Sequence, residues 1–250
     1  EGQAPFALPM VTTSAEAAKI KKPMLASSTL CKYFDVIDAV RRKTGGEGVV
    51  KLPDIQSPMG IAALIWNKAD LFVAMHEEPE AVKELAEKVQ SFLADFFDEW
   101  FARYGKDFIA HFPDYYMPYG VTLSDDEIGA VSSKMFKEFF EPGLRFLTER
   151  YGALGIHCCA HARHQWENLR GLQNLKLLNL NTGAAHVHDA FDFFKDKCAQ
   201  WNEWFDADVP FWQAAERLSK GTRCVINVNA ETKEEALRLS ELLNEKYGKV

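Results

Sequence analysis

Apolar positions recur with helical spacing in some segments of this chain and form short continuous runs in others. Residues 30–43 have helical spacing and a basic end, and Thr44-Gly45-Gly46 follows as a stop signal, which predicts a helix. A longer helix is predicted from about Pro79 to Tyr104, because its apolar residues form one stripe at helical period. The stripe consists of Val82, Leu85, Val89, Phe92, Leu93, Phe96 and Phe97.

Short apolar runs alternate with such helices along the whole chain. Strands are predicted over residues 49–55, 115–123, 153–156, 175–180 and 223–228, and further helices over residues 59–66, 133–151, 165–172, 189–205 and 232–246. Ser57-Pro58 is typical of a helix N-cap followed by proline, and Pro142 predicts a kink. Strand–helix alternation predicts parallel strands joined by helical crossovers.

We expect an α/β protein with one domain over residues 1–250, in which residues 1–14 form an irregular lead-in. A (β/α)8 TIM-type barrel is favoured over an open doubly wound sheet, because no glycine-rich nucleotide loop follows a strand. About six strands are convincing where a full barrel needs eight. The barrel is therefore predicted to be shortened or incomplete at the N-terminus, unless strands are hidden in the first 45 residues. The sequence starts at Glu1, so we expect a processed start or a missing N-terminal portion.

Composition excludes several classes of function. The formal net charge of −7 argues against nucleic acid as a partner, because nucleic-acid binders present a basic face. No apolar run approaches the ~20 residues needed to span a bilayer, and no signal peptide is visible. Five cysteines, two of them adjacent, do not form a disulfide pattern. We expect a cytoplasmic protein with reduced thiols and no membrane insertion.

Residues 157–164 carry the most informative chemistry, with potential metal ligands at His157, Cys158, Cys159, His161 and His164. Alternate residues of a strand point the same way, so His157 and Cys159 can reach one zinc ion from one face while Cys158 faces away. The segment also follows a predicted strand, where parallel α/β folds collect ligands. The alternative is a buried polar histidine beside an inert thiol.

Three segments resemble, in order, motifs of the uroporphyrinogen decarboxylase superfamily, which includes the zinc-dependent methylcobamide:coenzyme M methyltransferases. Residues 54–62 resemble its strand–turn–helix element, and Ser124-Asp125-Asp126 with residues 135–142 resembles its Asp-Asp loop and Phe-x-x-Phe-x-x-Pro helix. Residues 157–161 resemble its His-x-Cys-Gly-Asn element. The resemblance extends from about Leu52 to the C-terminus.

The resemblance implies a (β/α)8 barrel with zinc held by His157, Cys159 and a distant cysteine, for which Cys224 stands in a comparable place. Three protein ligands and one open position are the catalytic arrangement of zinc. The implied reaction is methyl transfer from a methylated corrinoid (methylcobamide) to a small-molecule thiol, with the corrinoid on a partner protein.

The chain departs from the family pattern at several positions. Ala160 and His161 replace the motif's glycine and asparagine, and Cys224 begins its apolar run, where the wrong end of a strand would keep it from the site. An arginine-rich substrate-binding element is missing, which disfavours the alternative of porphyrinogen decarboxylation. A non-catalytic member that binds a small molecule or partner is the third hypothesis.

Four further residues are candidates for substrate binding. Asp125 and Asp126 could orient a ligand, although helix capping is the favoured interpretation. Tyr119 could line a pocket together with its neighbours, and His161 could be a rival ligand or a solvent-facing loop histidine. The remaining cysteines, Cys31 and Cys198, are expected to pack in amphipathic helices.

Overall fold

The computed structural model of the chain describes residues 7–46, 50, 52–106, 110–111, 115–116, 120–180, 186–201, 216–225 and 230–248. Its centre is a parallel five-stranded sheet in which the strands follow one another in chain order, β3-β4-β5-β6-β7. The strands are β3 (Gly120–Ser124), β4 (Ala153–Cys158), β5 (Leu175–Leu180), β6 (Ala199–Gln200) and β7 (Arg223–Cys224). A separate antiparallel pair joins β1 (Ala110–His111) and β2 (Tyr115–Tyr116).

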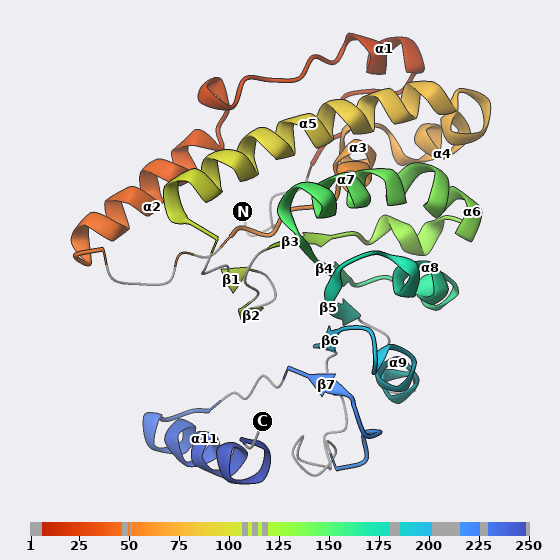
Figure 1. The fold of residues 1–250 in the computed structure, drawn as a ribbon. Coiled ribbons are helices and arrows are strands. Elements are labelled where there is room, and N and C mark those ends of the chain that lie inside the picture. The colour runs from red at the N-terminus through yellow and green to blue at the C-terminus, as the bar shows by residue number, and fades with distance from the viewer. Residues whose placement is uncertain are drawn as a thin grey trace.

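Helices connect β3 to β4, β4 to β5 and β5 to β6 and cover the sheet, as expected for parallel strands with crossovers. Figure 1 shows α7, α8 and α9 along one side of the sheet, with α5 across the top and α11 at the opposite end. The α-helices are α1 (Ser14–Lys19), α2 (Cys31–Lys43), α3 (Pro58–Ile65), α4 (Lys68–Glu77), α5 (Pro79–Tyr104), α6 (Ser133–Met135), α7 (Glu141–Tyr151), α8 (Trp166–Gly171), α9 (Val187–Phe194) and α11 (Lys233–Tyr247). Shorter turns are η1 (Leu25–Ser27), η2 (Glu127–Ala130), the π-helical η3 (Phe136–Phe140) and η4 (Arg163–Gln165).

The long helix α5 organises the N-terminal half of the core. Its predicted apolar stripe is buried except for the half-buried Phe92, and Phe96, Phe97 and the neighbouring Trp100 are at most 1 % exposed. Phe34 of α2 packs against this stripe, with its ring 5.4 Å from that of Phe96 between centroids. Aromatic pairs at this separation add to the stabilisation from apolar burial. The predicted long helix is thus confirmed from Pro79 to Tyr104.

Local capping signals of the sequence are also confirmed. The Ser57 side chain accepts a hydrogen bond from the backbone N–H of Gly60, and Pro58 is the first residue of α3. Thr232 accepts one from the backbone N–H of Glu235 and is the N-cap of α11. These bonds satisfy backbone donors that a helix start would otherwise leave unpaired.

Two predicted elements differ in the structure. The strand expected over residues 49–55 is reduced, in the described residues, to a parallel bridge between Gln56 and Ser124. The helix expected over residues 189–205 stops at Phe194, and Ala199–Gln200 is strand β6. The apolar spacing of the sequence continues past the end of α9, because β6 lies under this helix and its residues are buried too. Cys198 is accordingly buried in the turn before β6, not in a helix.

The kink predicted at Pro142 takes the form of the π-helical turn η3 just before the proline. A π-turn adjusts the backbone where proline cannot donate its N–H. In the described part of the first 45 residues, β structure is limited to a bridge between Val11 and Trp66. The described parallel strands therefore form an open sheet of five and not the expected closed barrel of eight. No helix in the described ranges is long and apolar enough to cross a membrane.

Candidate metal centre

The candidate site lies at the carboxyl ends of β3 and β4. Ser124, the last residue of β3, is in register with His157 near the end of β4. The residues that follow β3 therefore emerge beside those that follow β4, and the backbone N–H of Asp125 donates to the carbonyl of His157 at 2.8 Å. The predicted position at a strand end followed by a loop is confirmed.

Strand alternation separates the two adjacent cysteines. Cys158 is fully buried, whereas Cys159 is exposed and faces the same way as His157. Burial raises the pKa of the Cys158 thiol to about 12, so this thiol is a neutral core residue. The prediction that Cys158 faces away from its neighbours is confirmed.

Three potential ligand atoms of different chemistry converge at this edge. Nε2 of His157 lies 3.0 Å from Sγ of Cys159, and that sulfur lies 3.5 Å from Oδ2 of Asp126. The ligand atoms of Asp126, His157 and Cys159 all lie within 4.8 Å of one another. In a tetrahedral zinc site with ordinary bond lengths, neighbouring N, O and S ligands are about 3.6 Å apart. The His157–Cys159 and Cys159–Asp126 separations lie within about 0.6 Å of this value, so this set of donor atoms fits a zinc ion after small movements of the side chains.

Asn179 on β5 sets the hydrogen-bonding state of His157. Its Oδ1 contacts Nδ1 of His157, and its Nδ2 contacts the backbone carbonyl of Trp201. Because a carbonyl oxygen only accepts, the amide must donate through Nδ2 to Trp201 and accept through Oδ1 from Nδ1. The imidazole proton is thereby assigned to Nδ1, and Nε2 presents its lone pair toward Cys159. Such a partner on the second ring nitrogen is the usual support of a metal-binding histidine.

The charge balance of the cluster also suits a cation. Burial raises the pKa of the Cys159 thiol to about 11, and the Asp126 carboxylate adds to this effect by charge repulsion and a hydrogen bond. Asp54 contributes a further repulsion. A divalent cation would reverse these effects, because it stabilises both thiolate and carboxylate. The mixture of imidazole, thiolate and carboxylate is characteristic of zinc sites.

Asp126 serves the loop as well as the cluster. Its Oδ1 accepts a hydrogen bond of 2.5 Å from the backbone N–H of Cys159, which fixes the loop after β4 against the loop after β3. Asp126 precedes η2 but makes no side-chain capping bond there. The favoured capping interpretation of Asp126 was therefore wrong, because the neighbouring strand end competes successfully for its carboxylate.

Asp125 is buried beneath the cluster. It is fully buried, and neither carboxylate oxygen has a hydrogen-bond partner among the described residues. Burial raises its pKa to about 8, while the nearby Ser57 side chain acts in the opposite direction. Asp125 does not cap a helix either, so the capping interpretation fails for both aspartates.

The other predicted site residues lie apart from the cluster. Cys224 on β7 pairs with Gln200 on β6, and Gln200 pairs with Leu178 on β5. Leu178 in turn pairs with Ile156 on β4, the residue before His157. Paired residues of a parallel sheet share a face, so Cys224 lies on the face opposite His157. It is also three strand spacings away, or ~14 Å along the sheet. The structure does not bring Cys224 together with His157 and Cys159, and its ligand role stays a prediction.

His161 is exposed in the loop after β4 and does not join the group of ligand atoms, which agrees with a loop histidine. His164 bonds instead to the backbone carbonyl of Val131 through Nε2, at 2.9 Å. Tyr119 lies outside the described residues.

Sequence reasoning missed Asn179 and Asp54. Asn179 is the single polar side chain in the second half of β5, and it is 5 % exposed. A polar residue within a run of buried leucines was the signal that could have found it. Asp54 accepts a hydrogen bond of 2.5 Å from the Ser124 hydroxyl at the end of β3, which no sequence pattern indicates.

Comparisons with known proteins assign the family. The family model described as uroporphyrinogen decarboxylase (URO-D) matches residues 1–199, so the chain belongs to the URO-D family. The match contains the cluster and ends before Cys224. A solved structure described as a methyltransferase from Methanosarcina mazei is similar at TM-score 0.65 and 11 % sequence identity, over 98 % of this chain and 72 % of that one. No curated protein matches. The five parallel strands represent part of the family's TIM barrel.

Proposed function

We propose that the protein catalyses zinc-dependent transfer of a methyl group from a methylated corrinoid to a thiol. The observation that carries the proposal is the convergence of Asp126, His157 and Cys159 at the strand ends. Three protein ligands leave one tetrahedral position open, which is the arrangement of catalytic zinc. The fold shared with a solved methyltransferase supports the same reaction class.

The zinc ion, when bound, would hold an incoming thiol as the nucleophilic thiolate near neutral pH. The protein side chains supply the remaining functions. His157, oriented by Asn179, presents Nε2, and Asp126 holds the Cys159 backbone in place. In the overall reaction the thiol sulfur gains the methyl carbon, the carbon–cobalt bond breaks with its electron pair left on cobalt, and the thiol proton passes to solvent. The corrinoid contributes the difficult chemistry.

We expect the corrinoid on a separate protein and the thiol as a small molecule. The expected zinc ligands are His157, Cys159 and Asp126, with Asp126 taking the place first expected for Cys224. This exchange rests on distance and strand face, since Asp126 lies beside the sulfur of Cys159 and Cys224 lies on the other side of the sheet.

Two measurements test the proposal. Elemental analysis of the purified protein should give about one zinc per chain, which is lost in the Cys159→Ser variant. Incubation with methylcobalamin and a panel of small thiols should then give thiol-dependent demethylation, followed by the change in the corrinoid spectrum. Absence of zinc would contradict the metal site. Zinc without demethylation would contradict catalysis and leave a binding protein.

Porphyrinogen decarboxylation is the second candidate, supported by the family description. Release of carbon dioxide from a carboxylated porphyrinogen, equal in wild type and in Cys159→Ser, would favour it over methyl transfer. The methyl-transfer proposal predicts no such release.

A further inference from the structure

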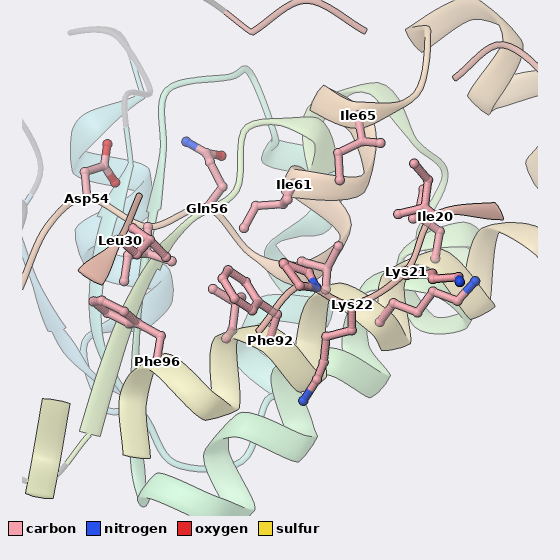
Figure 2. Close-up of a pocket in the computed structure, with 16 residues that line it drawn as sticks. Ile20, Lys21, Lys22, Leu30, Asp54, Gln56, Ile61, Ile65, Phe92 and Phe96 are labelled. Carbon is pink, nitrogen blue, oxygen red and sulfur yellow. The ribbon is translucent and has the colours of Figure 1, made fainter. Parts of the chain in front are cut away.

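A cavity lies beside the segment that precedes α3. Its volume is about 430 Å³, within the usual size range of ligand sites. Its walls are mainly apolar side chains of α3, α5 and the N-terminal segment. Figure 2 shows Asp54 and Gln56 toward one end of this cavity and Ile20 and Lys21 toward the other, with Ile61 and Phe92 between them.

Asp54, Ile55 and Gln56 all line this cavity. Consecutive side chains of an extended segment point to opposite faces, so a cavity that contacts three in a row must lie along the edge of the segment. The opposite edge is already used, because Ser124 of β3 donates to the Ile55 carbonyl and accepts from the Ser57 N–H, both at 2.8 Å. The cavity therefore lies at the side of the segment that β3 does not cover.

The backbone groups at this edge are available for pairing. In a parallel bridge the residue between the two bonded ones directs its N–H and carbonyl away from the partner strand, and here that residue is Gln56. Among the described residues, the backbones of Asp54 and Gln56 make no hydrogen bond. Edge groups of this kind are a template for an added strand.

We propose that an extended, apolar polypeptide segment binds in this cavity as an added strand, paired with the backbone of Asp54 and Gln56. Hydrogen bonds between the two backbones would hold the segment alongside Asp54 and Gln56. The apolar walls would accept every second side chain of the segment, as in known strand-addition complexes. Lys21 makes no ion pair with another described residue, so an acidic residue at one end of the segment would add charge complementarity. The proposal is independent of the proposed methyl transfer.

A small apolar ligand is the competing occupant, and peptides with blocked amides separate the two. The probes are three synthetic decapeptides in which valine, isoleucine or phenylalanine alternates with threonine, each with a terminal glutamate. Each has a matched control with N-methylated backbone amides, and dodecanoate serves as the small apolar probe. Amide hydrogen exchange of the full chain reads out protection at Gln56, and fluorescence polarisation gives affinity.

At least one unmodified peptide should protect the Gln56 amide, and its N-methylated control should bind at least tenfold more weakly. Gln56→Pro removes the backbone N–H that points away from β3 and should weaken binding of the peptide by a similar factor. Ile61→Trp fills the cavity and should also weaken binding, whereas Val73→Trp, at an exposed position on α4, should not. Circular dichroism and thermal unfolding of each variant check that the fold is intact.

Failure of all three peptides at millimolar concentration to protect Gln56 would overturn the proposal. So would equal binding of the N-methylated controls, or binding of dodecanoate alone. Retained peptide binding in both Gln56→Pro and Ile61→Trp would place the peptide elsewhere and reject this site.

Discussion

Asn179 and His157 face each other across the β4–β5 pair, with the amide oxygen of Asn179 against Nδ1 of the histidine. The other end of the amide is held by the Trp201 carbonyl, so the orientation of the amide is fixed from both sides. His157 thus receives its tautomer from a strand that contributes no ligand. This relationship leads to the first prediction.

Asn179→Ala should weaken zinc binding by about 10–100-fold, the usual effect of removing the partner of a metal-binding histidine. Asn179→Asp keeps an acceptor for the Nδ1 proton of His157, so this variant should lose less zinc affinity than Asn179→Ala. Competition with a chromophoric chelator measures the affinity, and ring-nitrogen chemical shifts of His157 report the tautomer. Equal affinities in wild type and Asn179→Ala would contradict the assigned role.

Asp126→Ala and Cys224→Ala distinguish the two versions of the ligand set. The geometry predicts loss of zinc in Asp126→Ala and full retention in Cys224→Ala, because only the first residue borders the cluster. Elemental analysis of both variants decides the matter. Zinc lost in Cys224→Ala and kept in Asp126→Ala would restore the family-derived set.

The adjacent cysteines should respond oppositely to the same substitution. Cys159→Ser should lose zinc, with little change in the stability of the metal-free protein, because this side chain is exposed. Cys158→Ser should keep zinc but lower the free energy of unfolding by roughly 1–3 kcal/mol, since it places a hydroxyl in an apolar interior. Zinc content and urea unfolding of both proteins test this. Zinc loss in Cys158→Ser from a folded protein would be inconsistent with the strand faces described above.

The stability of the metal-free protein should fall as the pH rises from about 4 to about 8. Asp125 has a pKa of about 8 in the folded protein, against an ordinary value of 3.8 for an aspartate in water. Below both values each state holds the proton, and between them the folded state holds a proton that the unfolded chain has lost. The free energy of unfolding should therefore decrease with rising pH, by at most ~1.4 kcal/mol per pH unit.

Asp125→Asn remains neutral and should remove this contribution. Urea unfolding with EDTA at several pH values, in wild type and variant, measures the difference. Parallel curves for the two proteins would show that Asp125 is not the group responsible.

Gly155→Ala should destabilise the sheet beside the cluster by roughly 1–3 kcal/mol. An added Cβ at Gly155 would contact the Thr122 side chain on β3, within the buried face that carries His157. Thermal unfolding of the metal-free variant checks the stability, and its zinc affinity reports any shift of His157. Unchanged values of both would mean that the neighbouring strand yields freely.

Sequence patterns predicted the local elements well where they had their own signals. The stripe of α5 and the caps at Ser57 and Thr232 were readable because their causes lie within a few residues of each other. The alternation that separates His157 and Cys159 from Cys158 is likewise a local property of any strand. These predictions are confirmed.

Partners distant in sequence could not be read in the same way. Helical spacing over residues 189–205 was extended through β6, because a buried strand end and a buried helix face have similar composition. The capping interpretation of Asp126 failed because its competitor, the Cys159 backbone, is 33 residues away.

The amino-acid sequence alone determined the alternation of strands and helices, the position of the candidate metal-binding segment after a strand, and which face His157 and Cys159 share. Tertiary structure decided which side chains join them, because strand register sets contacts between residues far apart in the chain. It brought Asp126 to Cys159 and Asn179 to His157, and it placed Cys224 on the other face of the sheet. The periodicity of a strand determines which face of the sheet each side chain points to. The pairing between strands determines which side chains distant in sequence lie close together.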